Sequence, residues 1–237
     1  YPGQALETWQ DAADPTPDVA GLHWVLRGLL SIPADKTGAE RRAFWTKLDA
    51  KVPPIPMMEE DGATFVLPAG EVFSGRGNSE NAELYTVFPF RFYGVGKPDL
   101  DIGRVTYERR GVKAGGGCWY QDDVQAAFLG LIEAARDMVI RRAGAKQGGS
   151  RFPAFWTGGN DYPPDQDHGG NLLMALQCML LQADDGKIQV LPAWPPEWDV
   201  EFKLHAPQRT TVEGTVRGGK LVALTVTPES RRDDVVV

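Results

Sequence analysis

The hydrophobic pattern of this 237-residue chain changes from helical to extended within one stretch, Leu172-Leu173-Met174-Ala175-Leu176-Gln177-Cys178-Met179-Leu180-Leu181-Gln182-Ala183-Asp184-Asp185-Gly186-Lys187-Ile188-Gln189-Val190-Leu191. Apolar residues recur at helical spacing as far as Leu180, whereas Ile188 to Leu191 is a short run typical of a strand. The acidic pair and glycine between them favour a turn. The stretch therefore predicts a helical part over 1–183, followed by a small β domain over 184–237.

Further helical patterns lie upstream. The clearest begins at Thr16-Pro17-Asp18, where a capping hydroxyl, a proline in the first turn and a carboxylate near the positive end of the helix dipole come together. This helix ends before Pro33. Together with the helix that ends at Leu180, six helices are expected, and the other four cover 39–51, 82–92, 99–109 and 122–142. A short hairpin is expected over 64–73, and strands over 188–191, 202–204, 211–216 and 221–226, the last two joined by a turn at Gly218-Gly219.

Composition argues against several classes of protein. The 25 Lys and Arg residues against 32 Asp and Glu residues give a net charge of −7, which disfavours binding to nucleic acid or to an anionic membrane surface. No apolar stretch approaches the roughly 18 residues of a membrane-spanning helix. The two cysteines, Cys118 and Cys178, lack the spacing of metal ligands, so neither a metal nor a cofactor is expected. Motifs of serine hydrolases, nucleotide hydrolases and zinc proteases are missing as well.

The densest group of reactive side chains precedes the last expected helix, in Asn160-Asp161-Tyr162-Pro163-Pro164-Asp165-Gln166-Asp167-His168-Gly169-Gly170. Carboxylates accept hydrogen bonds, and an imidazole can donate or accept them, so this segment is able to hold a water molecule or a sugar hydroxyl. The alternative is structural: an aspartate before a helix caps it, and the glycines allow close packing.

Two other segments carry candidates. Glu7 lies beside Trp9, an environment that can keep a carboxyl group protonated for general-acid catalysis, although an isolated glutamate is often simply solvated. Trp119 and Tyr120 can cover the apolar face of a sugar while Asp122 binds hydroxyl groups, although Asp122 can instead cap the helix that follows.

The order of features from Pro164 to Pro196 resembles the end of family 95 glycoside hydrolases, which are α-L-fucosidases and related enzymes. The shared features are an Asp before Gly169-Gly170, a helix ending in Met179-Leu180-Leu181-Gln182, the segment Leu191-Pro192-Ala193-Trp194-Pro195 with Trp198, and a terminal β unit. The resemblance implies a mainly α fold, in which helical hairpins form part of an (α/α)6 toroid followed by a small antiparallel β-sandwich. Because six helices are half of such a toroid, it also implies a missing N-terminal segment of the same protein or a tight partner chain. Most family members are exported from bacterial cells, which implies an extracellular or periplasmic location, although the chain shows no signal peptide.

The resemblance also implies an activity. The family inverts the anomeric centre, with a glutamic acid that protonates the leaving oxygen and an aspartate that helps to activate water. By similarity, Glu7 is the acid and Asp165 assists on the water-activating side. The residues expected to line the sugar site are Asp167, His168, Asn160, Trp119, Asp122 and Trp156. The segment 81–92 lacks the histidines that the family has there, so fucose specificity does not follow.

The resemblance therefore implies a glycoside hydrolase acting on an oligo- or polysaccharide. Two alternatives remain open. One is a non-catalytic glycan-binding or structural helical module, and the other is a lyase or phosphorylase on the same fold.

Overall fold

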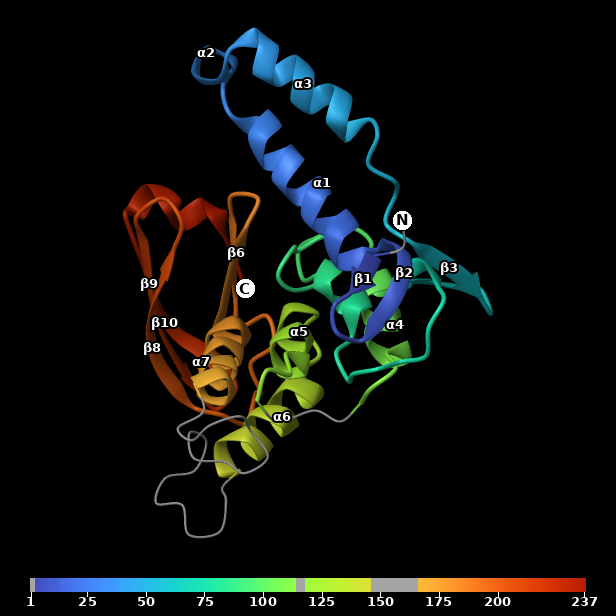
Figure 1. Cartoon of the computed structure of the whole chain (residues 1–237). Coiled ribbons are helices and arrows are strands. Elements are labelled where there is room, and N and C mark those ends of the chain that lie inside the picture. The colour runs from blue at the N-terminus through green and yellow to red at the C-terminus, as the bar shows by residue number, and fades with distance from the viewer. Residues whose placement is uncertain (1–2, 114–117, 146–165) are drawn as a thin grey trace. The chain divides into compact units, whose positions relative to one another are not determined.

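The computed structural model describes residues 3–113, 118–145 and 166–237 (Figure 1). The chain divides into two compact units. The first consists of Tyr1–Tyr93 with Lys97–Lys113, and the second of Gly94–Gly96 with Ala114–Val237.

The predicted mainly α fold with a partial (α/α)6 toroid is wrong for the described residues. Helix accounts for 41% and strand for 26%, and the strands form three three-stranded sheets and one two-stranded sheet. In the first unit helices and strands are interspersed along the chain, whereas in the second unit three α-helices precede two small sheets. The physical reason is that helical spacing of apolar residues specifies a helix locally but does not specify whether it packs on another helix or on a sheet.

The first unit opens with a hairpin that carries Glu7. Strands β1 (Gly3–Ala5) and β2 (Trp9–Pro15) pair antiparallel, and β5 (Ala69–Val72) adds to the other edge of β2. Small side chains fill the core beside this sheet, namely Ala5, Ala12, Ala69 and Ala82. The turn places Leu6 in the left-handed region, at φ 55°, and thereby presents Glu7 at the tip of the hairpin.

A helical hairpin follows this sheet (Figure 1). Helix α1 (Thr16–Ser31) and helix α3 (Ala39–Asp49) are joined by the short helix α2 (Ala34–Thr37), which confirms the two helices expected there. The Thr16 hydroxyl does not cap its own helix but donates to the Leu67 carbonyl oxygen at 2.5 Å, so it ties α1 to the segment between β4 and β5.

The rest of the first unit differs from the prediction in its pairing. Strand β4 (Ala63–Val66) pairs with β3 (Met57–Glu60), whereas β5 pairs with β2, so the hairpin expected over 64–73 is wrong. The helix expected over 82–92 is only the 3-10 turn η1 (Ala82–Thr86), since Pro89 has no N–H to continue a helix. Helix α4 (Leu100–Arg109) forms where expected. It is fixed to β4 because the Val66 backbone N–H donates to the Thr106 hydroxyl oxygen at 3.0 Å.

Three helices open the second unit. They are α5 (Asp122–Phe128), α6 (Ile132–Gly144) and α7 (Gln166–Leu180). The single helix expected over 122–142 is split into α5 and α6, because the chain turns at Gly130, whose φ of 67° a helix cannot contain.

Two small sheets complete the second unit. One has the order β11 (Val235–Val236), β7 (Lys187–Val190), β6 (Leu181–Asp184), and the other the order β10 (Lys220–Thr227), β9 (Thr210–Arg217), β8 (Val200–Ala206). The 3-10 turn η2 (Glu229–Asp234) precedes β11. Both sheets contribute to one apolar cluster that includes Ile188, Val190, Ala206 and Val212. The expected strands and the turn at Gly218-Gly219 are confirmed.

Candidate functional site

The Glu7 turn is tied to a loop that lies about seventy positions further along the chain. The Glu7 side chain is exposed, and its Oε2 accepts a hydrogen bond from Asn78 Nδ2 at 3.1 Å. The adjacent Thr8 is fully buried; its hydroxyl donates to the Glu80 carbonyl oxygen at 3.0 Å, and its carbonyl accepts the Gly77 N–H at 2.7 Å. These bonds fix the backbone directly after Glu7 and tie the Glu7 carboxyl group to the loop.

Arg76 holds that loop in shape. Its Nε donates to the Asn78 carbonyl oxygen at 3.0 Å, while Nη2 donates to the Glu80 carbonyl oxygen at 2.6 Å and to Asn81 Oδ1 at 3.1 Å. The guanidinium lies 5.6 Å from the centre of the Trp9 ring, within cation–π range. The loop, the turn and the first residue of β2 therefore form one hydrogen-bonded and stacked assembly.

Glu80 provides a second carboxyl group in this assembly, in a different environment from that of Glu7. Burial raises the pKa of Glu80 above its usual value, the neighbouring Glu7 carboxylate raises it further, and a hydrogen bond from the Glu7 backbone N–H acts in the opposite direction. Glu80 Oε2 is buried and has no hydrogen-bond partner among the described residues. The two carboxyl groups therefore lie in different environments, with Glu7 exposed and Glu80 partly buried.

This environment predicts a pH-dependent effect on stability. A raised pKa means that the folded chain binds the Glu80 proton more tightly than the unfolded chain, so the free energy of unfolding falls as the pH rises above the ordinary value of 4.5. Glu80→Gln cannot ionise, and we expect it to be more stable than the wild type at neutral pH, with a difference that disappears below pH 4.5. Urea unfolding at several pH values measures this difference. The exposed variant Glu71→Gln serves as control, and a pH-independent difference for Glu80→Gln would contradict the prediction.

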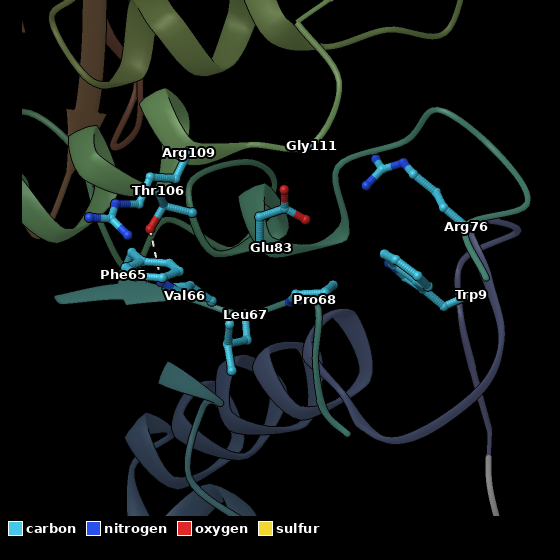
Figure 2. A pocket seen from close by; sticks show the side chains of 10 residues that line it. All are labelled: Trp9, Phe65, Val66, Leu67, Pro68, Arg76, Glu83, Thr106, Arg109 and Gly111. Carbon is cyan, nitrogen blue, oxygen red and sulfur yellow. Dashed lines mark hydrogen bonds between the residues drawn. The ribbon is translucent and has the colours of Figure 1, made fainter. Parts of the chain in front are cut away.

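A cavity of about 310 Å³ adjoins this assembly within the first unit. Figure 2 shows Trp9 and Arg76 on one side, Phe65, Thr106 and Arg109 on the other, and Glu83 between them. Arg109 lies over the Phe65 ring at 4.5 Å and forms an ion pair with Glu60. The wall of the cavity thus combines aromatic surface with charged and hydrogen-bonding groups, as ligand sites do.

In the second unit, several predicted residues belong to a buried polar network. Arg142 Nε donates to Asp123 Oδ2 at 2.8 Å, and both side chains are 1% exposed. The same guanidinium donates to the carbonyl oxygens of Cys118 at 3.1 Å and Tyr120 at 2.6 Å. Burial raises the pKa of the Asp123 carboxyl group, and the Arg142 charge and hydrogen bonds partly offset that rise. The network fixes the segment that bears Trp119.

His168 is part of this network. Its Nδ1 accepts the Cys118 backbone N–H at 3.2 Å, so Nδ1 carries no proton, and its Nε2 lies 3.0 Å from the Arg142 carbonyl oxygen, to which it donates. His168 is 1% exposed. These contacts give the imidazole a structural role as a neutral ring.

The predicted site residues are divided between the units. Glu7 lies in the first unit, whereas Trp119, Asp122, Asp167 and His168 lie in the second. Trp119 stacks on Tyr120 with a ring separation of 5.6 Å, Asp167 is exposed on the first turn of α7, and Asp122 is 2% exposed. Asn160, Trp156 and Asp165 lie outside the described residues.

Arg76, Glu80 and Glu83 were not predicted from the sequence as site residues. The glycine-flanked segment Gly75-Arg76-Gly77 indicates a loop that another part of the chain can approach closely, and this is the only local signal. Nothing in the sequence shows that the loop meets the Glu7 turn.

Over 3–113, 118–145 and 166–237, no group of three or more His, Cys, Asp or Glu residues is arranged to hold a metal ion. Within the same ranges, no helix is both long and apolar enough to cross a membrane.

No protein-family model matches this sequence, and no curated protein shows significant similarity to it.

Proposed function

We propose that this chain is part of a glycoside hydrolase in which Glu7 is the general acid. One observation carries the proposal: the exposed Glu7 carboxylate, at the tip of a hairpin, accepts a hydrogen bond from Asn78, and Trp9, two residues further on, lines a cavity. Acid-catalysed cleavage of a sugar linkage requires a positioned carboxyl group close to the site that binds the sugar.

The proposal includes an atomic account of the proton-transfer step. Because Asn78 Nδ2 donates to Glu7 Oε2, the proton of the acid form sits on Oε1. Glu7 gives this proton to the glycosidic oxygen as the bond from that oxygen to the anomeric carbon breaks, and a water molecule adds to the anomeric carbon and loses a proton. The assignment of Asp165 to water activation stays a prediction, since residue 165 lies outside the described residues.

Product analysis tests the function directly. The protein is incubated with a panel of aryl glycosides and neutral oligosaccharides, and the products are followed by proton NMR from the first minutes. We expect a free reducing sugar whose first-formed anomer is opposite to that of the substrate.

Other products would contradict hydrolysis and indicate a different activity. An unsaturated sugar indicates a lyase, and a sugar phosphate formed only with added phosphate indicates a phosphorylase. Saturable binding with no product indicates a glycan-binding module.

A further inference from the structure

We propose that the cavity lined by Trp9 and Arg76 binds a hexuronic acid ring, whose carboxylate pairs with the Arg76 guanidinium. The inference rests on the proposed function and deepens it, because it names the class of sugar and the side chain that selects it. It draws on the first unit alone.

Arg76 is a half-buried cation whose hydrogen-bond partners are all uncharged. Its three hydrogen bonds end on the carbonyl oxygens of Asn78 and Glu80 and on the side-chain oxygen of Asn81. Among the described residues, no carboxylate lies within ion-pair distance of the guanidinium. Charges that are withdrawn from water are normally paired with an opposite charge, so this guanidinium is suited to a bound anion.

One end of the guanidinium is accessible to a ligand. Nη1 makes no hydrogen bond with any described residue, and it does not belong to the buried polar atoms that lack a partner there, so it retains exposed surface. Nη1 lies beside Gly111, where an added Cβ would be only 2.4 Å away, and both residues line the cavity. Figure 2 shows the guanidinium directed from its loop towards Gly111. A carboxylate at this position meets a donor that the other three hydrogen bonds already hold in place.

The other cation of the wall has its own counter-ions. Arg109 forms an ion pair with Glu60, and its Nη2 lies 3.9 Å from Asp61 Oδ2. Arg76 is therefore the cation of the described wall whose charge is left for a ligand to balance.

The carboxyl groups near the cavity leave the side of Arg76 open to an anion. Glu83 lines the wall but is only 6% exposed, its Oε2 is buried, and the residue has interactions of its own. Glu7 and Glu80 are not among the described residues that line the cavity.

The rest of the wall and its size suit the ring of a sugar. The C–H groups on one face of a pyranose pack against apolar and aromatic side chains. Apolar side chains make up half of the described lining, namely Trp9, Phe65, Val66, Leu67 and Pro68. The volume of about 310 Å³ is at the lower end of the range for small-molecule sites, which favours one ring.

A pair of matched ligands tests the role of the carboxylate. Isothermal titration compares the methyl glycosides of glucuronate and galacturonate with the corresponding uronamides, which keep the ring and its size but carry no charge. For the uronate that binds best, we expect at least tenfold tighter binding than for its amide, as for a charge-assisted hydrogen bond. Acetate, titrated alone, measures what the carboxylate contributes without a ring.

Two glycine substitutions assign the preference to Arg76. In Gly111→Ala the added methyl group must displace the Arg76 guanidinium, whereas in Gly75→Ala it meets nothing within 4 Å; neither glycine has a left-handed backbone. We expect the preference for the uronate over its amide to fall below threefold in Gly111→Ala and to stay at the wild-type value in Gly75→Ala. Thermal unfolding of each variant establishes that it is folded under the conditions of the titration.

The outcomes separate this inference from the proposed function. Equal binding of uronate and amide by the wild type, an unchanged preference in Gly111→Ala, or acetate binding as tight as that of the uronate overturns the uronate site. The expected preferences without any hydrolysis of nitrophenyl glucuronides and galacturonides, or of neutral glycosides, refute the glycosidase and leave the site standing. Hydrolysis of neutral glycosides with no preference for a uronate does the reverse.

Discussion

Arg142→Ala lowers the free energy of unfolding by an expected 3–5 kcal/mol, the range for removing one partner of a buried ion pair. The substitution leaves the Asp123 carboxylate buried at 1% exposure without its counter-ion. It also removes the donors to the Cys118 and Tyr120 carbonyl oxygens. Urea unfolding followed by circular dichroism measures the loss at pH 7.

The loss should depend on pH. Burial raises the pKa of Asp123, and in the variant no guanidinium opposes that rise, so Asp123 takes up a proton more readily as the pH falls. Protonation removes the uncompensated charge, and we therefore expect the deficit of Arg142→Ala to shrink at acidic pH.

A control and a double variant isolate the ion pair. Arg141→Ala, on the exposed side of the same helix, should change the free energy of unfolding by no more than about 0.5 kcal/mol. The double variant Asp123→Ala/Arg142→Ala should lose less than the sum of the two single variants, because neither charge is then left buried alone. A loss in Arg142→Ala no larger than in Arg141→Ala would show that the network does not hold this segment.

Glu7→Gln should reduce kcat/KM for hydrolysis by about 10²- to 10⁴-fold, the usual contribution of a general acid. Glutamine has nearly the same shape, and its side-chain oxygen still accepts the hydrogen bond from Asn78 Nδ2, so the turn is preserved. What is lost is the proton that Glu7 gives to the leaving oxygen. Steady-state hydrolysis of aryl glycosides at the optimum pH of the wild type measures the reduction.

The leaving group distinguishes an acid from a residue that merely binds. An activated nitrophenyl group departs without much protonation, whereas an alkyl or sugar leaving group requires it. The reduction in Glu7→Gln should therefore be much smaller for nitrophenyl glycosides than for methyl glycosides, while Glu71→Gln, an exposed glutamate on β5, keeps full activity on both. Equal reductions on the two substrates would assign Glu7 to binding and remove it from proton transfer.

Short-range patterns in the sequence were sufficient to predict much of the secondary structure. The Thr16-Pro17-Asp18 signal identified the start of α1, and the glycine pair at Gly218-Gly219 identified the turn between β9 and β10. These features depend on residues within a few positions of one another. The sequence also made Glu7 a candidate acid, because Glu7 stands two residues before Trp9.

Pairing over long distances in the chain was not predictable in this way. Whether β4 pairs with β3 or with β5 depends on how each strand packs, and both arrangements satisfy the same alternation of side chains. The prediction of a toroid was wrong for a related reason, since an apolar helix face packs on a sheet as well as on another helix.

The sequence by itself determined where several helices and strands begin, and it made Glu7 a candidate for acid catalysis. Only the tertiary structure decided that the Glu7 turn meets the loop of Arg76 and Glu80, since Thr8 and Glu80 are 72 positions apart. The physical reason is that helix starts and turns depend on local backbone geometry, whereas the burial of Glu80, the contact of Arg76 with Gly111 and the cavity lined by Trp9 and Arg76 arise only when distant segments pack together.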